Sequence, residues 1–492
     1  MSRLNKLTIK EAQAGLKEKK FSSIELTKAC LEQIKKIDKD IHACLTVEGE
    51  KALKQAKIAD EMIERGEQSA LTGIPYLAKD NIMTEGIKTT AASKILENYK
   101  SPYDATIISI IKNQGGVLLG KTNLDEFAHG ASTENSAFGP TKNPHDLERV
   151  PGGSSGGSAV ATASEQCIYS LGTDTGGSIR CPAAYCGIAG LKPSYGRISR
   201  YGLIAMTSST DCPGCLTKTV EDSAIVLKEL AGFDMMDSTS ARENADDYAA
   251  GLGKGVKGMR IGVPREFFIS PPLQGGAMGG EKSGMDKDVE KTIKNAIKKL
   301  EAMGMEIVEI SLPHTKYAVP VYYIITPAEI SSNLARFDGI KYGLSKQDGN
   351  DLLDVYLSSR GEGFGAEAKR RIMIGTYVLS SGYYDAYYLK AQKVRAIIKK
   401  EIDDALKHVD VIITPTTPDL PFKLGEQVDD PLKMYLEDVF LATASLAGLP
   451  AISVPCGKIG NLPVGMQIIG KAFDEGKILR VGHQFEQSNL DG

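Results

Sequence analysis

The sequence predicts an α/β fold in which helices pack on the faces of a central sheet. Amphipathic segments with the period of a helix alternate with short apolar runs typical of strands. The chain has 492 residues, of which 42% are hydrophobic and 25% charged, and this composition is typical of a globular protein rather than a disordered one. We see no repeat of about 20–50 residues, so a solenoid is not expected.

The first part of the chain supplies helices and two strands. Residues 22–25 (SSIE) have the pattern of a helix N-terminus, because a serine and a glutamate three residues apart cap each other's backbone amides. The apolar run Ile74–Ala78 follows Gly73 and is more typical of a strand than of a helix. We expect two helices within residues 8–38, helices over 51–65 and 105–112, and strands over 74–78 and 117–119.

The rest of the chain continues this alternation. We expect helices over 289–303 and 386–408 and at the C-terminus, and strands over 168–171, 305–310, 409–413, 451–454 and 465–469. Residues 270–284 are rich in Gly and Pro and have no periodicity, so we expect a mobile surface insertion there.

Charge and hydropathy exclude several classes of protein. The formal net charge of −3 gives no overall attraction for nucleic acid, so any RNA contact must be local or belong to a partner. No apolar run approaches the roughly 18 residues of a membrane-spanning helix. Residues 1–10 lack the apolar core of a signal peptide, so we expect a cytoplasmic protein.

Eight cysteines are too few for a disulfide scaffold. Cys212 and Cys215 have C-x-x-C spacing, but zinc needs four ligands and no second pair follows. We expect packing or loop thiols and no metal, with metal or redox use as the less favoured alternative.

Two clusters of glycine and serine lie within residues 151–180. Neither has the Lys-Ser or Lys-Thr of a phosphate-binding loop. Residues 152–156 match the G-x-S-x-G elbow of hydrolases around Ser154, but the residues before them are typical of a loop instead of a strand. The elbow interpretation is therefore disfavoured, although Ser154 can act in another arrangement.

The second cluster is Asp174–Arg180, which follows an expected strand. Gly176 and Gly177 directly precede Ser178, and such a pair lets successive backbone N–H groups point at one spot. That geometry suits an oxyanion hole with Ser178 as the nucleophile; the alternative is a flexible turn.

A serine nucleophile needs a base, and none of the six histidines has a recognisable triad context. Lys79 follows the apolar run 74–78, where burial can lower the pKa of its amine toward neutrality. The alternative is an ordinary surface lysine.

Three motifs in order resemble the amidase signature family: Lys79 in GIPYLAKDNI, Ser154 in PGGSSGGSA and Ser178 in DTGGSIRCPAAYCGIAGLKPSYGRIS. Stretches such as DEFAHGASTENSAFGPTKNP and PLKMYLEDVFLATASLAGLPAISVPCG are most similar to the A subunits of tRNA-dependent amidotransferases. The likeness covers nearly the whole chain. It implies one domain over residues 1–492, with a catalytic core at about 70–220 and a central mixed β-sheet covered on both faces by α-helices.

The resemblance also implies roles for individual residues. Ser178 would be the acylated nucleophile, Ser154 would relay its proton through an unusual cis peptide after Gly153, and Lys79 would be the base. The oxyanion hole would comprise Thr175, Gly176 and Gly177.

For the substrate, the resemblance implies glutamine. Arg371 would bind its α-carboxylate, Asp438 its α-ammonium, and Tyr322 would line the pocket; the alternative for Arg371 and Asp438 is a surface ion pair. His129-Gly130-Ala131 departs from the Met-Gly-Ser expected near the pocket.

The family resemblance further implies a heterotrimer. Ammonia would pass to a B subunit, which would use ATP and Mg²⁺ to convert Glu-tRNA(Gln), Asp-tRNA(Asn) or both, and a small C subunit would clamp the two. This chain itself would need no cofactor. The rival hypotheses are a stand-alone amidase for a small aliphatic or aryl amide and a scaffold that has lost turnover.

Overall fold

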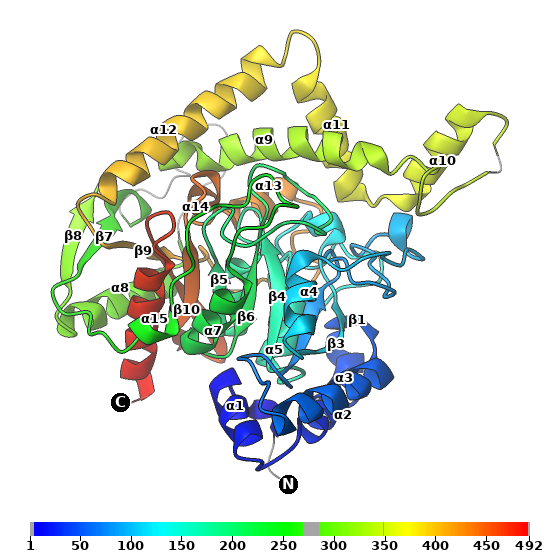
Figure 1. The fold of residues 1–492 in the computed structure, drawn as a ribbon. Helices are drawn as coiled ribbons and strands as arrows, with labels where there is room; N and C mark the ends of the chain where they lie inside the picture. The colour runs from blue at the N-terminus through cyan, green and yellow to red at the C-terminus, as the bar shows by residue number, and fades with distance from the viewer. Residues whose placement is uncertain (1–3, 269–284, 348, 491–492) are drawn as a thin grey trace.

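The computed structural model describes residues 4–268, 285–347 and 349–490, and a single sheet of eleven strands lies at the centre of this part of the chain (Figure 1). The strand order is β1-β3-β2-β4-β6-β5-β10-β11-β9-β7-β8. The strands are β1 (Cys44–Val47), β2 (Pro75–Lys79), β3 (Val117–Thr122), β4 (Tyr169–Asp174), β5 (Ala189–Lys192), β6 (Cys212–Thr217), β7 (Arg260–Pro264), β8 (Glu306–Ile310), β9 (Val411–Pro415), β10 (Ala451–Ile459) and β11 (Leu462–Ile469).

The sheet is mixed. Strand β2 runs parallel to both β3 and β4, and β7 runs parallel to β8 and β9, whereas the pairs from β4 to β9 through the middle of the sheet are antiparallel. Every residue of β2, β3, β4, β6 and β9 is buried, so both faces of the sheet are covered. The predicted α/β fold with a central mixed sheet is therefore confirmed.

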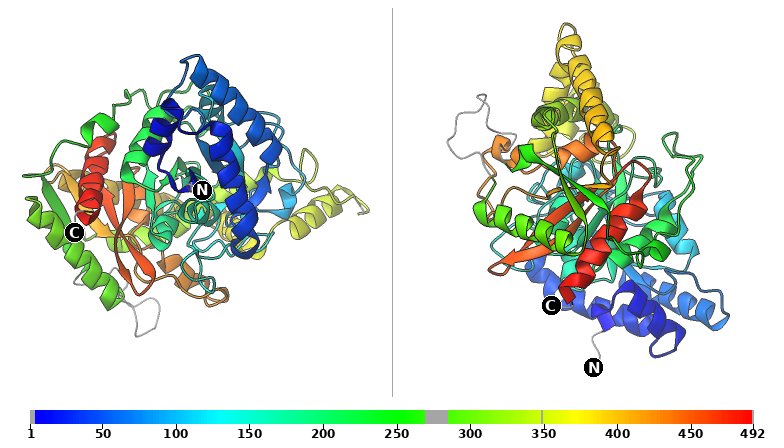
Figure 2. Two further views of the ribbon diagram at one scale, coloured as in Figure 1. Left: turned by 90° about the horizontal axis from the view of Figure 1, so that it is seen from below. Right: turned by 90° about the vertical axis from the view of Figure 1, so that its left-hand side faces the viewer.

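Fifteen α-helices in the described residues surround the sheet. They are α1 (Ile9–Lys17), α2 (Ser23–Ile41), α3 (Gly49–Glu64), α4 (Thr106–Asn113), α5 (Gly156–Ala163), α6 (Arg180–Cys186), α7 (Val220–Leu230), α8 (Lys287–Ala302), α9 (Ala318–Asn333), α10 (Leu352–Gly363), α11 (Ala366–Leu379), α12 (Lys390–Ala405), α13 (Pro431–Leu436), α14 (Ala442–Leu446) and α15 (Glu475–Leu490). Figure 2 shows the N-terminal helices and α12 at opposite ends of the molecule.

Local sequence signals account for the boundaries of several helices. The Ser22 hydroxyl accepts from the Glu25 N–H at 3.1 Å, and Glu25 accepts from the Ser22 N–H at 2.8 Å, so the predicted cap starts α2. Gly115, with φ of +78°, ends α4 as expected. The predicted helix over 386–408 starts as a π-helical turn, Asp385–Leu389, before α12.

Other expectations have different outcomes. Strands β5, β6 and β7 and helices α9–α11 had no signal in the sequence that we recognised. Cys212 and Cys215 are buried free thiols on β6, so they lie in a strand and not in a loop. The expected insertion at 270–284 lies outside the described residues.

The sheet positions the functional region through β2 and β4. These strands are parallel neighbours, with Ala78 opposite Leu171, so both carboxyl ends lie at the same edge. Lys79 ends β2, and Thr173 and Asp174 end β4. Lys79 and the Gly176-Gly177-Ser178 turn are therefore brought together by strand pairing.

None of the helices in the described ranges is both long enough and apolar enough to cross a bilayer.

Candidate active site

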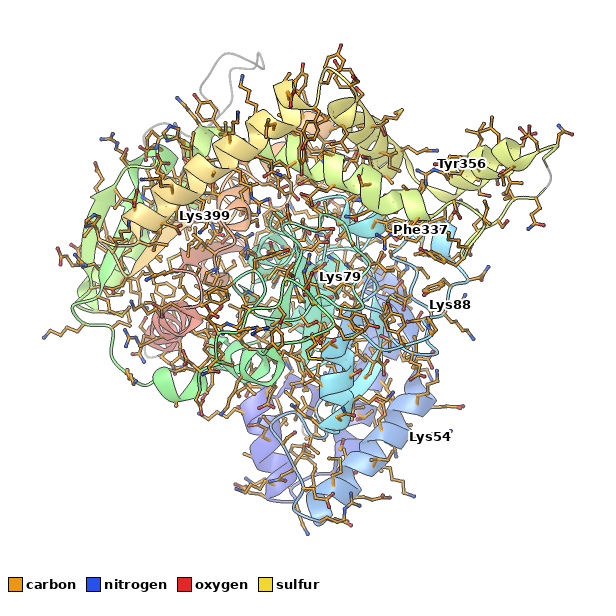
Figure 3. The ribbon with its side chains drawn as sticks, turned by 45° about the horizontal axis from the view of Figure 1, so that its top comes forward. Lys54, Lys79, Lys88, Phe337, Tyr356 and Lys399 are labelled. Carbon is orange, nitrogen blue, oxygen red and sulfur yellow. The ribbon has the colours of Figure 1, made fainter. Side chains whose placement is uncertain are left out.

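Lys79 has no exposed surface. Figure 3 places it near the centre of the molecule, while Lys54, Lys88 and Lys399 lie on exposed positions. Its Nζ lies 2.7 Å from Ser154 Oγ and donates to Ser155 Oγ at 2.9 Å and to Thr173 Oγ1 at 2.9 Å. The surface-lysine alternative is thereby excluded.

Burial sets the protonation of this amine. Removal from water lowers the pKa of Lys79 to about 7, against the attraction of the carboxylates of Asp125, Asp174 and Asp211, which raises it. A substantial fraction of the amine is therefore neutral at neutral pH, and a neutral amine has a lone pair that can accept a proton.

Ser154 lies in the loop before α5, in keeping with the rejection of a strand-borne elbow. The peptide bond between Gly153 and Ser154 is cis, as the family resemblance implies. The Ser154 carbonyl oxygen accepts from the Asp125 N–H at 3.3 Å, and the Ser155 N–H donates to the Ser178 carbonyl oxygen at 3.0 Å. These backbone contacts place the 153–155 loop between Lys79 and Ser178.

Ser178 is 7% exposed. Among the described residues its Oγ makes no hydrogen bond, so the structure joins Lys79 to Ser154 by a hydrogen bond but does not join Ser154 to Ser178 by one. Hydrogen bonds of catalytic groups are often long in the absence of substrate and tighten when it binds.

The turn before Ser178 has the features of an anion-binding nest. Within the described chain, the backbone N–H groups of Gly176, Gly177 and Ser178 donate to no acceptor. Gly177 has φ of +154°, a conformation that favours glycine. A methyl group at Gly176 would lie 2.5 Å from the Tyr322 ring, so only glycine fits between the turn and this ring. The nest is open to a ligand and is bounded by Tyr322.

A buried ion pair supports the nest from below. Asp174 accepts from Arg180 Nη2 at 2.8 Å and Nε at 2.9 Å, and neither side chain has exposed surface. The Arg180 guanidinium also donates to the Leu441 carbonyl oxygen at 3.1 Å and to Ser445 Oγ at 2.8 Å. Leu441 packs on Gly177, so Arg180 links the nest to the segment that carries Asp438.

Arg371 and Asp438 are both buried, which contradicts the alternative of a surface ion pair. The Arg371 guanidinium lies over the rings of Tyr323 (5.3 Å) and Tyr435 (5.4 Å), and Tyr323 Oη donates to Asp438 at 2.8 Å. The Tyr323 side chain thus contacts both groups.

The free hydrogen-bonding capacity of this region suits a zwitterion. Arg371 Nε donates to Glu367 at 2.8 Å, while its two Nη groups form no hydrogen bond with described residues. Burial raises the pKa of Asp438 to about 7, although the charge of Arg371 lowers it. A bound ammonium group would favour the carboxylate form of Asp438 in the same way.

Tyr322 is buried and lies next to Gly176, at one end, and within the electrostatic influence of Asp438 and Arg371 at the other. The structure therefore brings the three expected substrate residues and the three expected catalytic residues to one region.

Sequence reasoning missed four groups that complete this region: Ser155, Thr173, Tyr323 and Glu367. Ser155 and Tyr323 directly follow residues that were singled out, so proximity in sequence was a signal for them. Thr173 at the end of β4 and Glu367, one turn before Arg371 on α11, had no signal of comparable strength.

His129 is buried, and neither ring nitrogen has a partner among the described residues. Burial and the charge of Arg371 lower its pKa well below the ordinary value, so the imidazole is neutral and does not compete with Lys79 as the base. No group of three His, Cys, Asp or Glu side chains in the described ranges is arranged to hold a metal ion.

The family comparison covers most of the chain. Residues 25–479 match the protein family described as Amidase. The A subunit of glutamyl-tRNA(Gln) amidotransferase from Caldanaerobacter subterraneus subsp. tengcongensis is 55% identical over 485 residues, covering 99% of this chain and 97% of that protein. The protein of the same name from Thermoanaerobacter pseudethanolicus is 54% identical over 486 residues, with coverage of 99% and 97%.

Solved structures agree with the sequence comparison. The crystal structure of the glutamyl-tRNA(Gln) amidotransferase A subunit from Thermotoga maritima has a TM-score of 0.80 and 42% identity, covering 98% of this chain and 95% of that one. The peptide amidase from Stenotrophomonas maltophilia has a TM-score of 0.79 and 28% identity, with coverage of 98% and 97%. The predicted resemblance is confirmed, and the chain belongs to the amidase family.

Proposed function

We propose that this chain is the glutamine-hydrolysing A subunit of a tRNA-dependent amidotransferase. The observation that carries the proposal is the buried Lys79 amine, with a pKa of about 7, lying 2.7 Å from Ser154 Oγ. The names of relatives at 54–55% identity over nearly the whole chain support the choice of glutamine and tRNA-dependent amidation.

Acylation begins with a proton relay. Ser178 Oγ attacks the side-chain amide carbon of glutamine, its proton passes to Ser154 Oγ, and the Ser154 proton passes to the neutral Lys79 amine. Ser178 is thereby made a better nucleophile without a free alkoxide, and Lys79 becomes an ammonium.

The oxyanion that forms accepts hydrogen bonds from backbone N–H groups of the nest at Thr175, Gly176, Gly177 and Ser178. Such preorganised donors stabilise the transition state more than the substrate. The proton then returns from Lys79 through Ser154 to the leaving nitrogen, and ammonia departs. Water hydrolyses the acyl ester, using the same relay, to give glutamate and free Ser178.

Substrate recognition uses the separated charges of Arg371 and Asp438. The two free Nη groups of Arg371 suit the planar α-carboxylate, and Asp438 suits the α-ammonium. Tyr322, next to Gly176, would guide the side-chain amide to Ser178.

The partners follow from the relatives' names and the family resemblance. Ammonia is passed to a B subunit, which uses ATP and Mg²⁺ to amidate Glu-tRNA(Gln), Asp-tRNA(Asn) or both, and a C subunit holds the other two together in the cytoplasm. This chain supplies no cofactor to the reaction, and its net charge of −3 is consistent with tRNA binding through the B subunit.

The direct test is to co-purify the chain with the B and C subunits of its host. Glutamine-dependent amidation is then measured with both misacylated tRNAs, and ammonia release is measured alongside. We expect Ser178→Ala to abolish ammonia release and Arg371→Ala to lower kcat/KM for glutamine by roughly 100-fold, through loss of a charge-assisted contact.

Arg336→Ala, at an exposed position, serves as the matched control and should leave glutamine turnover unchanged. Unchanged glutamine turnover in Arg371→Ala would favour a stand-alone amidase, and unchanged ammonia release in Ser178→Ala would remove the assigned nucleophile.

A further inference from the structure

Asp125 is a buried carboxylate beside the relay to which the mechanism above gives no task. It follows β3 by three residues and has no exposed surface. Its Oδ2 accepts from the Thr133 N–H at 2.8 Å, and its Oδ1 accepts from the Asn135 N–H at 3.1 Å. Two backbone amides therefore fix its orientation.

The carboxylate packs directly against the loop that carries Ser154. A methyl group added at Gly153 would clash with Asp125 Oδ2, and one added at Gly130 would clash with its Cγ. The Asp125 N–H also donates to the Ser154 carbonyl oxygen at 3.3 Å. Asp125 thus contacts both Gly153 and Ser154, on the side of the loop from which Ser154 reaches the Lys79 amine.

The charge of Asp125 has no dedicated partner. Three carboxylates act on Lys79, and Asp125 has the largest effect of the three. Asp174 is already neutralised by Arg180, and Asp211 is held by the Thr175 hydroxyl at 2.7 Å and by backbone amides. Among the described residues no lysine or arginine forms an ion pair with Asp125, and Lys79 is the cation whose charge acts on it.

We propose that Asp125 is a positioning residue for the relay: its carboxylate stabilises the ammonium that forms on Lys79, and its contacts hold Gly153 and Ser154 against the amine. This inference rests on the proposed relay from Ser178 through Ser154 to Lys79. The proton balance is unchanged, because Asp125 accepts no proton; it makes Lys79 a stronger base through its charge. Asp125 contacts neither the substrate nor the reacting atoms.

The sign of the expected effect follows from the charges. The Asp125 anion favours the ammonium form and so raises the pKa of Lys79. Replacing it by a neutral group lowers that pKa by about one unit, with Asp174 and Asp211 still present. The charged groups that act on Asp125 itself are Lys79 and Glu134. Lys79 then stays neutral to lower pH, but it is a weaker base when neutral.

The test uses the full chain and a fluorophosphonate probe. The probe loses fluoride when Ser178 Oγ attacks its phosphorus, so the rate reports activation of Ser178 without requiring glutamine or the B and C subunits. In Asp125→Asn we expect the plateau rate to fall roughly three- to ten-fold and the acid limb of the pH profile to move about one unit lower. A merely structural role would lower the rate and leave the acid limb in place, which would overturn the proposal.

Asp222→Asn is the matched control. Asp222 is equally buried, accepts from the Ile9 N–H at 2.9 Å, and also has a pKa raised to about 6 by burial, but it joins α7 to α1 and has no contact with the relay. It should lower the melting temperature without moving the acid limb.

If Asp125→Asn does not melt cooperatively, Asp125→Ala with added formate replaces it, because formate can occupy the position between the Thr133 and Asn135 amides. A rate that rises with formate concentration supports the proposal, and a rate insensitive to formate contradicts it. Normal probe labelling of the wild type without glutamine hydrolysis would reject the proposed substrate and leave the role of Asp125 intact.

Discussion

Individual residues in this protein depend on how closely their neighbours approach them. Lys79 is the main example: lowering the pKa of a lysine from its ordinary value of 10.5 to about 7 corresponds to roughly 4–5 kcal/mol against the charged form. The cost is imposed by full burial and is partly offset by three carboxylates. Its polar neighbours, Ser154, Ser155 and Thr173, satisfy the amine without neutralising it.

The Gly176 position provides a test at the same scale. In Gly176→Ala the new methyl group would lie 2.5 Å from the Tyr322 ring, so the turn or the ring must shift. Because the N–H groups of this turn are the proposed oxyanion donors, we expect kcat for glutamine to fall by about 100-fold, with a smaller change in KM. Steady-state ammonia release measures both.

Gly476→Ala is the control for that substitution. Gly476 lies on α15 with nothing within 4 Å of an added methyl group, so the variant should keep full activity and gain about 0.5–1 kcal/mol of helix stability. Equal activity of both variants would show that the turn at Gly176 takes no part in catalysis.

At the scale of elements, β4, the nest and α6 act as one unit joined by Asp174 and Arg180. The Asp174 carboxylate accepts from the Ile179 and Arg180 N–H groups at the start of α6, while the Arg180 guanidinium donates to Gln467 on β11. Loss of either charge leaves the other buried and unpaired.

We therefore expect Arg180→Met to destabilise the fold by about 3–5 kcal/mol, because it leaves the Asp174 carboxylate buried without a partner. Urea denaturation followed by circular dichroism measures the loss. Lys399→Met, which removes an exposed pair with Asp403, should change stability by less than about 1 kcal/mol. Similar stabilities of the two variants would contradict the structural role of the buried pair.

The elements also show which signals in a sequence survive tertiary packing. The cap at Ser22 and the strand at 74–78 were predictable because their signals are local: a reciprocal pair of hydrogen bonds, and an apolar run after glycine. Helix α9 escaped prediction because it is apolar on most sides and contains Pro327, so it lacks the amphipathic period of a surface helix. Strand β6 escaped because Pro213 and Gly214 are typical of turns.

At the scale of the whole molecule, the C-terminal helix closes the chain onto its own beginning. Glu486 on α15 accepts from the Val220 N–H, at 3.2 Å to one oxygen and 3.3 Å to the other, at the start of α7, and Asp222 on α7 binds the N-terminus of α1. The first and last helices are thus both anchored on α7, in line with the proximity of α1, α7 and α15 in Figure 1.

This arrangement makes stability depend on pH. Burial raises the pKa of Glu486 to about 7, so the folded state binds this proton more tightly than the unfolded chain, where the pKa is near 4.5. The contribution of Glu486 to stability is therefore greatest below pH 4.5 and decreases as the pH rises to about 7. We expect Glu486→Gln to gain stability relative to the wild type between about pH 5 and about pH 7.5.

Urea midpoints at the two pH values measure that difference. Glu290→Gln, on the exposed side of α8 in a surface pair with Lys294, is the control and should show little dependence on pH over the same range. A wild type and Glu486→Gln pair that stays parallel would mean that Glu486 is not titrating as its burial requires.

The sequence by itself determined the α/β class, the helices and strands with strong periodicity, and the identity of Lys79, Ser154 and Ser178, because these depend on local patterns and on motifs with fixed spacing. Only the tertiary structure decided that the Lys79 amine is dry, that Arg371 and Asp438 are buried around Tyr323, and that Asp125 lies against Gly153. Burial and the distance between residues far apart in sequence arise from packing of the whole chain, and a pKa or a close contact depends on them directly.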